Sequence, residues 1–394
     1  MSRSRLSKIA VAVATGVVGV VGAGLAAPAH ASTAPASEQV PARTAAPTQN
    51  IVLGAKNEAA AAVATALASS ATAEEMREAL THSDTIEFAQ PRTEGLRRVA
   101  AQLRAANAKI LEAKGLPADT GNILQARLIN PKARQQLLAG AAPLIAAQPD
   151  AATHTLKARR LDGSPVTVTP AMTATRPVIT LDYDGDKALE AGTKVLQQGF
   201  RHAWPQAAEA MRKPGSVATG ASTAGAAAGT KRVSRIQEIS LKDDEEPFFK
   251  GDAEIFALVS GNDTNDTPFV SDPIPMTYLD EDDTTYRPNQ NLFEWSRFGW
   301  DEAGVSFFEE DDGTNYKSIV SAVVTAVGTL AKATDIATVV TTVINAIPDS
   351  WWTDSTDDVD AFYSLNQASG NGSLLHGAGG NVSMRLQTVD VPRA

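Results

Sequence analysis

The stretch PVITLDYDGDKALEAGTKVLQQGFRHAW, residues 177–204, contains the change of hydrophobic period that decides the fold. Residues 177–183 form a short apolar run, which is typical of a strand. From Asp186 to Trp204 the apolar residues return at helical spacing. A strand followed at once by a helix indicates a fold that contains both kinds of element.

The chain before this stretch is first helical. Thr72 and Glu75 match a capping box, in which the Thr oxygen and the Glu carboxylate satisfy backbone amides at the start of a helix. Residues 94–114 place their large apolar side chains on one face. Asn130 followed by Pro131 predicts another helix start, with proline in the first turn.

Strand patterns then precede residue 177. Residues 153–160 and 165–169 alternate in polarity on either side of Asp162-Gly163, a pair that favours the turn of a tight hairpin. Helices followed by a small sheet and one more helix indicate an α+β domain over residues 51–205. Residues 206–235 are rich in Ala, Gly, Ser and Thr, and we predict a linker there.

The remaining residues, 236–394, predict an acidic antiparallel β-sandwich, so the fold class of the whole chain is α+β. Short strands between acidic loops favour this architecture, and we expect them at residues 253–259, 292–295, 305–308, 361–365 and 382–386. Residues 319–347 interrupt them with apolar residues at helical spacing. This segment predicts one or two helices packed on the sandwich, with a membrane-inserting hairpin as the alternative. Lys332 and Asp335 leave neither half long enough for a transmembrane span.

The N-terminus has the three parts of a secretory signal peptide. Arg3, Arg5 and Lys8 precede an uncharged apolar run, and Ala29-His30-Ala31 supplies a small-x-small cleavage motif. We predict cleavage after Ala31, a flexible spacer over residues 32–50, and a secreted or extracytoplasmic mature protein. The chain has no cysteine, so disulfides cannot stabilise it and thiol chemistry is excluded.

Charge is distributed unevenly along the chain. Residues 241–361 contain 26 Asp and Glu against 6 Lys and Arg, whereas residues 32–240 contain 18 against 24. An acidic surface repels phosphates, and the mildly basic half has no dense Lys/Arg stripe, so we expect no nucleic-acid partner.

Acidic clusters lie next to several of the expected strands. If loops at one end of the sandwich converge, their carboxylates would repel one another unless a cation lay between them. Calcium takes six to eight oxygen ligands in flexible geometry, so we predict a calcium site. Its candidate ligands are Asp282, Asp283, Asp311, Asp312, Asp357 and Asp358. The alternative is that these carboxylates are solvated surface charges.

The segment Asp182-Tyr-Asp-Gly-Asp186 resembles the start of an EF-hand loop, but it has Lys187 and Thr193 where Gly and Glu are required. An Asp-rich helix N-terminus explains it more simply. No zinc-protease, serine-hydrolase, Walker A or dinucleotide-binding motif is present in the sequence. Paired carboxylates leave a glycan hydrolase open as an alternative.

Three acidic blocks are distinctive: residues 278–290, 308–317 and 351–363. Together with residues 126–131 and 177–192 they resemble an uncharacterised family of exported bacterial proteins, domain of unknown function 3103. The resemblance implies that both halves belong to one unit, and it implies no activity.

We therefore predict a secreted, non-catalytic protein that binds a surface, glycan or protein ligand, with a calcium-stabilised sandwich. The alternatives are a hydrolase of envelope or polymeric glycan and a membrane-active protein that uses residues 319–347.

Overall fold

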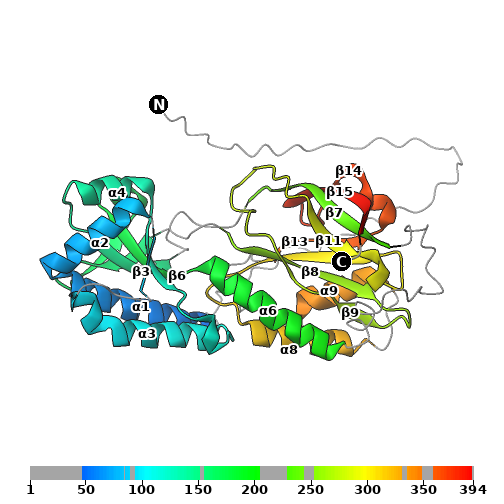
Figure 1. The fold of residues 1–394 in the computed structure, drawn as a ribbon, viewed down its shortest axis with the longest axis horizontal. Coiled ribbons are helices and arrows are strands. Elements are labelled where there is room, and N and C mark those ends of the chain that lie inside the picture. Colours follow the sequence, from blue (N-terminus) through cyan, green and yellow to red (C-terminus); the bar gives the residue numbers. More distant parts are fainter. Residues whose placement is uncertain are drawn as a thin grey trace, which may run out of the picture. The chain divides into compact units, whose positions relative to one another are not determined.

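Three sheets organise the part of the chain that the computed structural model describes (Figure 1). That part comprises residues 47–83, 85–88, 94–150, 155–204, 229–243, 253–330, 335–347 and 358–392. Residues 44–394 form one compact unit. The α+β class is confirmed. The expected signal peptide, the spacer as far as residue 46 and residues 206–228 of the expected linker lie outside the described residues.

The first sheet has six strands in the order β1-β2-β6-β3-β4-β5. Their bounds are β1 Thr85–Glu87, β2 Leu124–Leu128, β3 Leu144–Asp150, β4 Thr155–Arg159, β5 Pro165–Val168 and β6 Val178–Tyr183. The predicted hairpin is confirmed: β4 pairs antiparallel with β5, and Gly163 has φ 83° in the turn. The strands β1, β2 and β3 were not predicted from the sequence.

The helices of this part of the chain are α1 Pro47–Leu67, α2 Ser70–His82, α3 Glu94–Ala113, α4 Pro131–Leu138, α5 Pro170–Thr173 and α6 Gly185–Ala203. Helix α1 packs on β3 and β6, whereas α6 leaves this sheet and packs on elements that follow residue 229 (Figure 1). Helix α3 confirms the helix predicted over residues 94–114 and ends one residue earlier, and the Asn130 side chain accepts a hydrogen bond from the Ala133 amide at the start of α4. The capping box is wrong, because α2 begins at Ser70 and Thr72 is buried within it. Two small residues, Ser69 and Ser70, start the helix earlier than the motif predicts.

The other two sheets contain the strands after residue 229. The five-stranded sheet has β8 Ile255–Asn262, β9 Pro268–Val270, β10 Ile274–Pro275, β12 Ala303–Glu309 and β13 Asp358–Leu365. The four-stranded sheet has β7 Thr230–Leu241, β11 Gln290–Glu294, β14 Asn371–His376 and β15 Val382–Pro392. All the pairs are antiparallel, and each of the five expected strands is present. Strand β7 begins inside the range expected to be a linker, and β14 was not predicted. The face-to-face sandwich stays a prediction.

The apolar segment forms two helices, α8 Tyr316–Gly328 and α9 Ile336–Ala346. In Figure 1, α8 lies alongside α6, and a side chain added at Gly192 of α6 would overlap the ring of Tyr316. Helix α9 packs on the five-stranded sheet over Gly304. Both helices bury apolar faces: Ile319, Val323 and Val327, and Ile336, Val339, Val340 and Val343. A membrane-inserting role would require the helices to leave these contacts.

Among the described residues no single helix is long and apolar enough to cross a membrane, and one bent pair, Thr48–Leu67 with Ser70–Leu80, meets that test by length and composition.

A buried carboxylate fixes the loop before β15. Asp360 of β13 is 4% exposed and accepts hydrogen bonds of 2.7–2.9 Å from four backbone amides. The donors are Ala361, Gly379, Asn381 and Val382. Asp360 belongs to one of the acidic clusters seen in the sequence, and its charge is satisfied within the protein.

Candidate functional site

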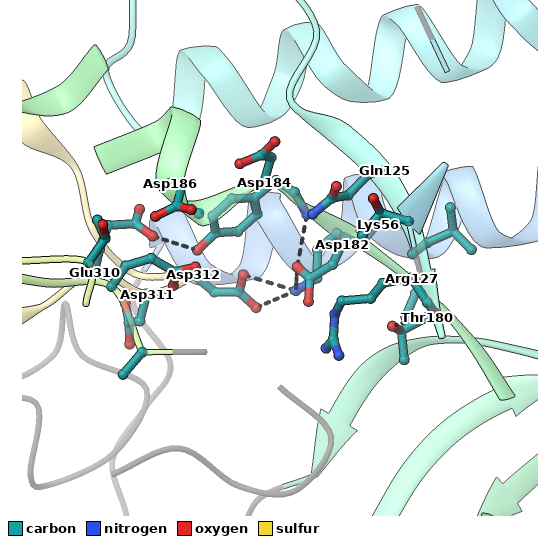
Figure 2. A pocket seen from close by; sticks show the side chains of 18 of the residues that line it. Lys56, Gln125, Arg127, Thr180, Asp182, Asp184, Asp186, Glu310, Asp311 and Asp312 are labelled. Atoms are coloured by element: carbon teal, nitrogen blue, oxygen red, sulfur yellow. Dashed lines mark hydrogen bonds and ion pairs between the residues drawn. The ribbon is translucent and has the colours of Figure 1, made fainter. Parts of the chain in front are cut away.

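A polar cavity of about 410 Å³ lies at the edge of the six-stranded sheet, next to the end of the pairing between β3 and β6 (Figure 2). Strands β3 and β6 pair in parallel through Leu144–Ala146 and Val178–Thr180. The next residues of these strands, Ala147 on β3 and Leu181 and Asp182 on β6, line the cavity. Helix α1, strand β2 and the residues that follow β12 contribute the other walls.

Lys56 of α1 is the cation at the centre of this cavity. Its side chain is 4% exposed, and its Nζ lies 3.0 Å from Asp182 Oδ1 and 2.9 Å from both carboxylate oxygens of Asp312. Burial disfavours the ammonium charge, but the two carboxylates outweigh that effect and raise the pKa of Lys56. Burial also opposes the charge on Asp182, yet Lys56 and then Arg127 lower the pKa of that carboxyl. Lys56 is therefore an ammonium that holds two carboxylates together.

A second buried cation follows the end of α3. Lys114 Nζ lies 2.6 Å from Glu310 Oε1, and both side chains are completely buried. Lys114 also donates to the backbone oxygen of Asp311 at 2.5 Å and to the hydroxyl of Tyr183 at 3.2 Å, and it lies 4.3 Å from the centre of the Tyr183 ring. These contacts join α3 and β6 to the loop after β12.

Glu310 is the carboxyl with the most unusual environment in the cavity. The Tyr183 hydroxyl donates a 3.1 Å hydrogen bond to Glu310 Oε2. Burial raises the pKa of Glu310 to about 7, against the opposing effect of Lys114. Burial and the nearby carboxylates also raise the pKa of Tyr183. Near neutral pH, Glu310 can therefore accept or release a proton, whereas Tyr183 keeps its own.

The segment 182–186 is the turn from β6 to α6, as the helix-start interpretation predicted. The Asp184 side chain caps α6 by accepting a hydrogen bond from the Lys187 amide. Asp182 and Tyr183, the last two residues of β6, also line the cavity, where Asp182 contacts Lys56 and Tyr183 contacts Lys114. Their alternation along the end of a strand is what sends the two side chains to different partners.

The loop after β12 is fixed by its own hydrogen bonds. Asp311 Oδ1 accepts from the Gly313 amide at 2.6 Å, and the Asp311 amide donates to Thr314 Oγ1 at 3.0 Å. Asn315 then caps α8 by accepting from the Ser318 amide. This tight turn positions Glu310, Asp311 and Asp312 along one wall of the cavity.

The structure separates those predicted calcium ligands that lie in its described residues. Asp311 and Asp312 line the cavity, and Asp312 contacts Lys56. Asp282 and Asp283 lie in an exposed turn, with Asp283 at φ 54°. Asp357 lies outside the described residues, and Asp358 begins β13 opposite Phe308. Among the described residues, no group of three or more His, Asp or Glu side chains is placed to hold a metal ion. Calcium binding by the predicted set stays a prediction, and the Lys56 ammonium is already a counter-charge for Asp312.

The cavity is strongly acidic overall. Among its described lining residues, two side chains are cationic, Lys56 and Arg127, and eight carry carboxyl groups. The carboxyl groups belong to Asp182, Asp184, Asp186, Glu254, Asp280, Glu310, Asp311 and Asp312. Low-dielectric walls concentrate such a field, so the cavity attracts positive charge.

The sequence reasoning missed the two buried lysines. Lys56 lies on α1 and Lys114 directly follows α3, the other charged residues of both helices are exposed, and neither lysine belongs to a motif. One signal was available: Lys114 directly precedes Gly115, where the helix was predicted to end, and the end of a helix is where a side chain can turn into a neighbouring segment.

A family model described as "Protein of unknown function (DUF3103)" matches residues 55–393. No curated protein and no solved structure matches the chain. The matched range includes both buried lysines and every carboxylate of the cavity, so the site lies within the part that defines the family. The resemblance seen in the acidic blocks is thereby confirmed, and the chain belongs to the DUF3103 family of proteins of unknown function.

Proposed function

We propose that this chain is an exported binding protein that holds a small, positively charged ligand in the acidic cavity. The observation that supports this most directly is the excess of carboxyl groups over cations among the described lining residues. The eight carboxyl groups outnumber the cations printed beside them, which are Lys56, Arg127, Lys114 beside Glu310, and Lys187 beside Asp184.

The dimensions of the cavity favour a small molecule over a surface or a polymer. A volume of about 410 Å³ is within the range of small-molecule sites, which are about 300–1,000 Å³. The lining offers many acceptors, so a ligand with several N–H or O–H donors would bind best. An amine with hydroxyl or further amine groups fits both requirements.

The fixed geometry of the walls supports binding without large rearrangement. Lys56 and Lys114 hold carboxylates from distant segments, and the turn at Asp311 is closed by its own hydrogen bonds. A preorganised site loses less conformational entropy when a ligand enters.

Calorimetry of the mature chain with butylamine, spermidine and glucosamine tests this proposal, with butyrate as the anionic control. We expect the amines to bind and butyrate not to bind, and we expect affinity to fall as salt screens the cavity. The double variant Asp186→Asn, Glu254→Gln should weaken amine binding, because both residues line the cavity. Glu190→Gln, an exposed carboxylate on the same helix as Asp186, is the matched control. Equal binding of butyrate and butylamine, or no binding of any amine, would refute the proposal.

A second function is favoured by one specific observation. Glu310 and Asp182 line the same cavity, and the pKa of Glu310 is raised to about 7 whereas that of Asp182 is lowered. Carboxyl groups with pKa values moved apart are typical of an acid and a base in glycoside hydrolysis. A screen on polymeric glycans tests this. A hydrolase would be supported by an activity that Glu310→Gln abolishes and whose pH–rate profile falls on the basic side near pH 7.

A further inference from the structure

A second cavity lies between α1 and the hairpin of β4 and β5, and its charge is opposite to that of the acidic cavity. It has a volume of about 460 Å³. Its charged lining residues are Lys157 and Arg159, and among the described residues no carboxylate lines it. The acidic cavity attracts positive charge, whereas this one attracts negative charge.

The strand register places both cations on the face of the sheet that α1 covers. Arg159 pairs directly with Ile145 of β3, and Ile145 packs in the core that contains the apolar residues of α1. Lys157 is two residues from Arg159, so alternation along β4 directs it to the same face. The two cations are therefore neighbours, about 7 Å apart along the strand.

The acidic residues of β6 lie on the opposite face. Ala158 of β4 and Val178 of β6 pack together in the smaller core. Alternation along β6 puts Thr180 and Asp182 on the face of Val178. The sheet separates these residues from Lys157 and Arg159, so the second cavity is an independent site.

A β-bulge and small side chains open this space. The register between β3 and β4 shifts between Ala146 and Gln148, which leaves Ala147 without a partner on β4. A bulge bends its strand locally. Ala147 lines the cavity together with Ala60 of α1 and Ile145, so the wall behind the cations is apolar.

The two cations have no partner in the described part of the chain. Lys157 and Arg159 are exposed, and neither makes a side-chain hydrogen bond or ion pair with a described residue. The carboxylates of the elements beside them are engaged elsewhere. Lys109 lies 2.6 Å from Glu58 of α1, and Asp162 accepts a hydrogen bond within the hairpin turn. Two positive charges therefore face the cavity together.

We propose that this cavity binds a small phosphate monoester. Its phosphate lies between Lys157 and Arg159, and its apolar part lies over Ala60, Ala147 and Pro165. A phosphate monoester carries about two negative charges near neutral pH, which matches the two cations. The guanidinium binds two phosphate oxygens as a fork, and the ammonium adds a charge-assisted hydrogen bond. The volume is within the range of small-molecule sites, about 300–1,000 Å³.

Calorimetric titration of the mature chain with phenyl phosphate tests this inference. We expect phenyl phosphate to bind, and we expect its affinity to fall between about pH 7 and pH 5, as the phosphate takes up a proton. Benzoate carries a single charge, inorganic phosphate has no apolar part, and benzyl alcohol has no charge. Each of these three should bind about tenfold more weakly or not at all.

Substitutions separate recognition by this cavity from attraction by overall charge. The double variant Lys157→Ala, Arg159→Ala should weaken the binding of phenyl phosphate by about tenfold or more. Arg104→Ala with Arg176→Ala is the matched control, because it removes two exposed cations that line neither cavity, and it should change the affinity little. All four side chains are exposed, so an unchanged Tm should verify that each variant is folded.

Three results would overturn this inference. If phenyl phosphate does not bind, the site does not exist, whatever butylamine does at the acidic cavity. If benzoate or benzyl alcohol binds as tightly as phenyl phosphate, the two cations do not recognise a phosphate. If the control variant weakens binding as much as the loss of Lys157 and Arg159, the ligand is held by the charge of the whole protein.

Discussion

Replacing Glu310 by Gln should remove one specific component of the pH dependence of stability. Glu310 is buried beside Lys114, and burial raises its pKa from the ordinary value of 4.5 to about 7. The folded protein therefore holds a proton on this carboxyl over a pH range in which the unfolded chain has released it. Glutamine has nearly the same shape and does not titrate.

The sign and size of the effect follow from linkage. Between about pH 4.5 and 7 the folded state binds more protons at this site than the unfolded state, so the free energy of unfolding falls as pH rises. The stabilisation is fully present below pH 4.5 and is lost as pH rises through 7. A shift of this size corresponds to about 3 kcal/mol at about 1.4 kcal/mol for each pKa unit.

The assay is denaturant unfolding of both proteins at several values between about pH 5 and pH 8. Glu310→Gln also leaves Lys114 without its carboxylate, which is a constant loss as long as Lys114 stays charged. The difference in unfolding free energy between the two proteins should nevertheless change by about 3 kcal/mol across this range, with the variant gaining relative to the native chain. A difference that stays constant with pH would refute the reasoning, and Glu190→Gln serves as the exposed control.

Three further substitutions should destabilise the protein, and a fourth should stabilise it. Lys56→Met should lower the free energy of unfolding by about 3–5 kcal/mol, because two carboxylates lose their buried counter-charge; denaturant unfolding measures it. Asp360→Ala should cost about 3 kcal/mol or more, since four backbone amides lose their acceptor, and its Tm should fall clearly below that of Asp360→Asn. Gly192→Ala should cost about 1–3 kcal/mol, because the new methyl group overlaps an aromatic ring of α8. By contrast, Gly54→Ala at an exposed position of α1 meets nothing and should stabilise the protein by about 0.5–1 kcal/mol; thermal unfolding of the Gly192→Ala and Gly54→Ala variants compares the two effects.

Local patterns in the sequence predicted many elements of the fold. The helix over residues 94–113, the Asp162-Gly163 hairpin and the strand at 178–183 each have a signal within a few neighbouring residues. The strands β2 and β3 have weaker signals, because β2 contains no β-branched residue and β3 contains only Ile145. The Ala- and Gly-rich stretch before residue 230 concealed the start of β7, since a low-complexity segment gives no sign of where it ends.

The candidate site was less predictable, because long-range contacts assemble it. The sequence directed attention to Asp311 and Asp312, and the structure does place both in the cavity. It could not show that the charge on Asp312 is met by Lys56, which lies 256 residues away. The acidic loops suggested a metal ion because the lysines that act as their counter-charges come from distant parts of the chain. Charge counts over a continuous segment cannot reveal such compensation.

The buried lysines also bear on why the site exists. Apolar residues of similar volume usually hold two segments together at least as well as a buried ion pair, since the charges must be taken out of water. Stability alone therefore does not explain why Lys56 and Lys114 bind carboxylates from β6 and the loop after β12. An ion pair does fix the direction of its oxygens, and here it fixes them along the walls of a cavity. Variants that replace both partners, such as Lys56→Met with Asp312→Leu, separate the two roles: recovery of stability without recovery of amine binding would assign the ion pairs to ligand recognition.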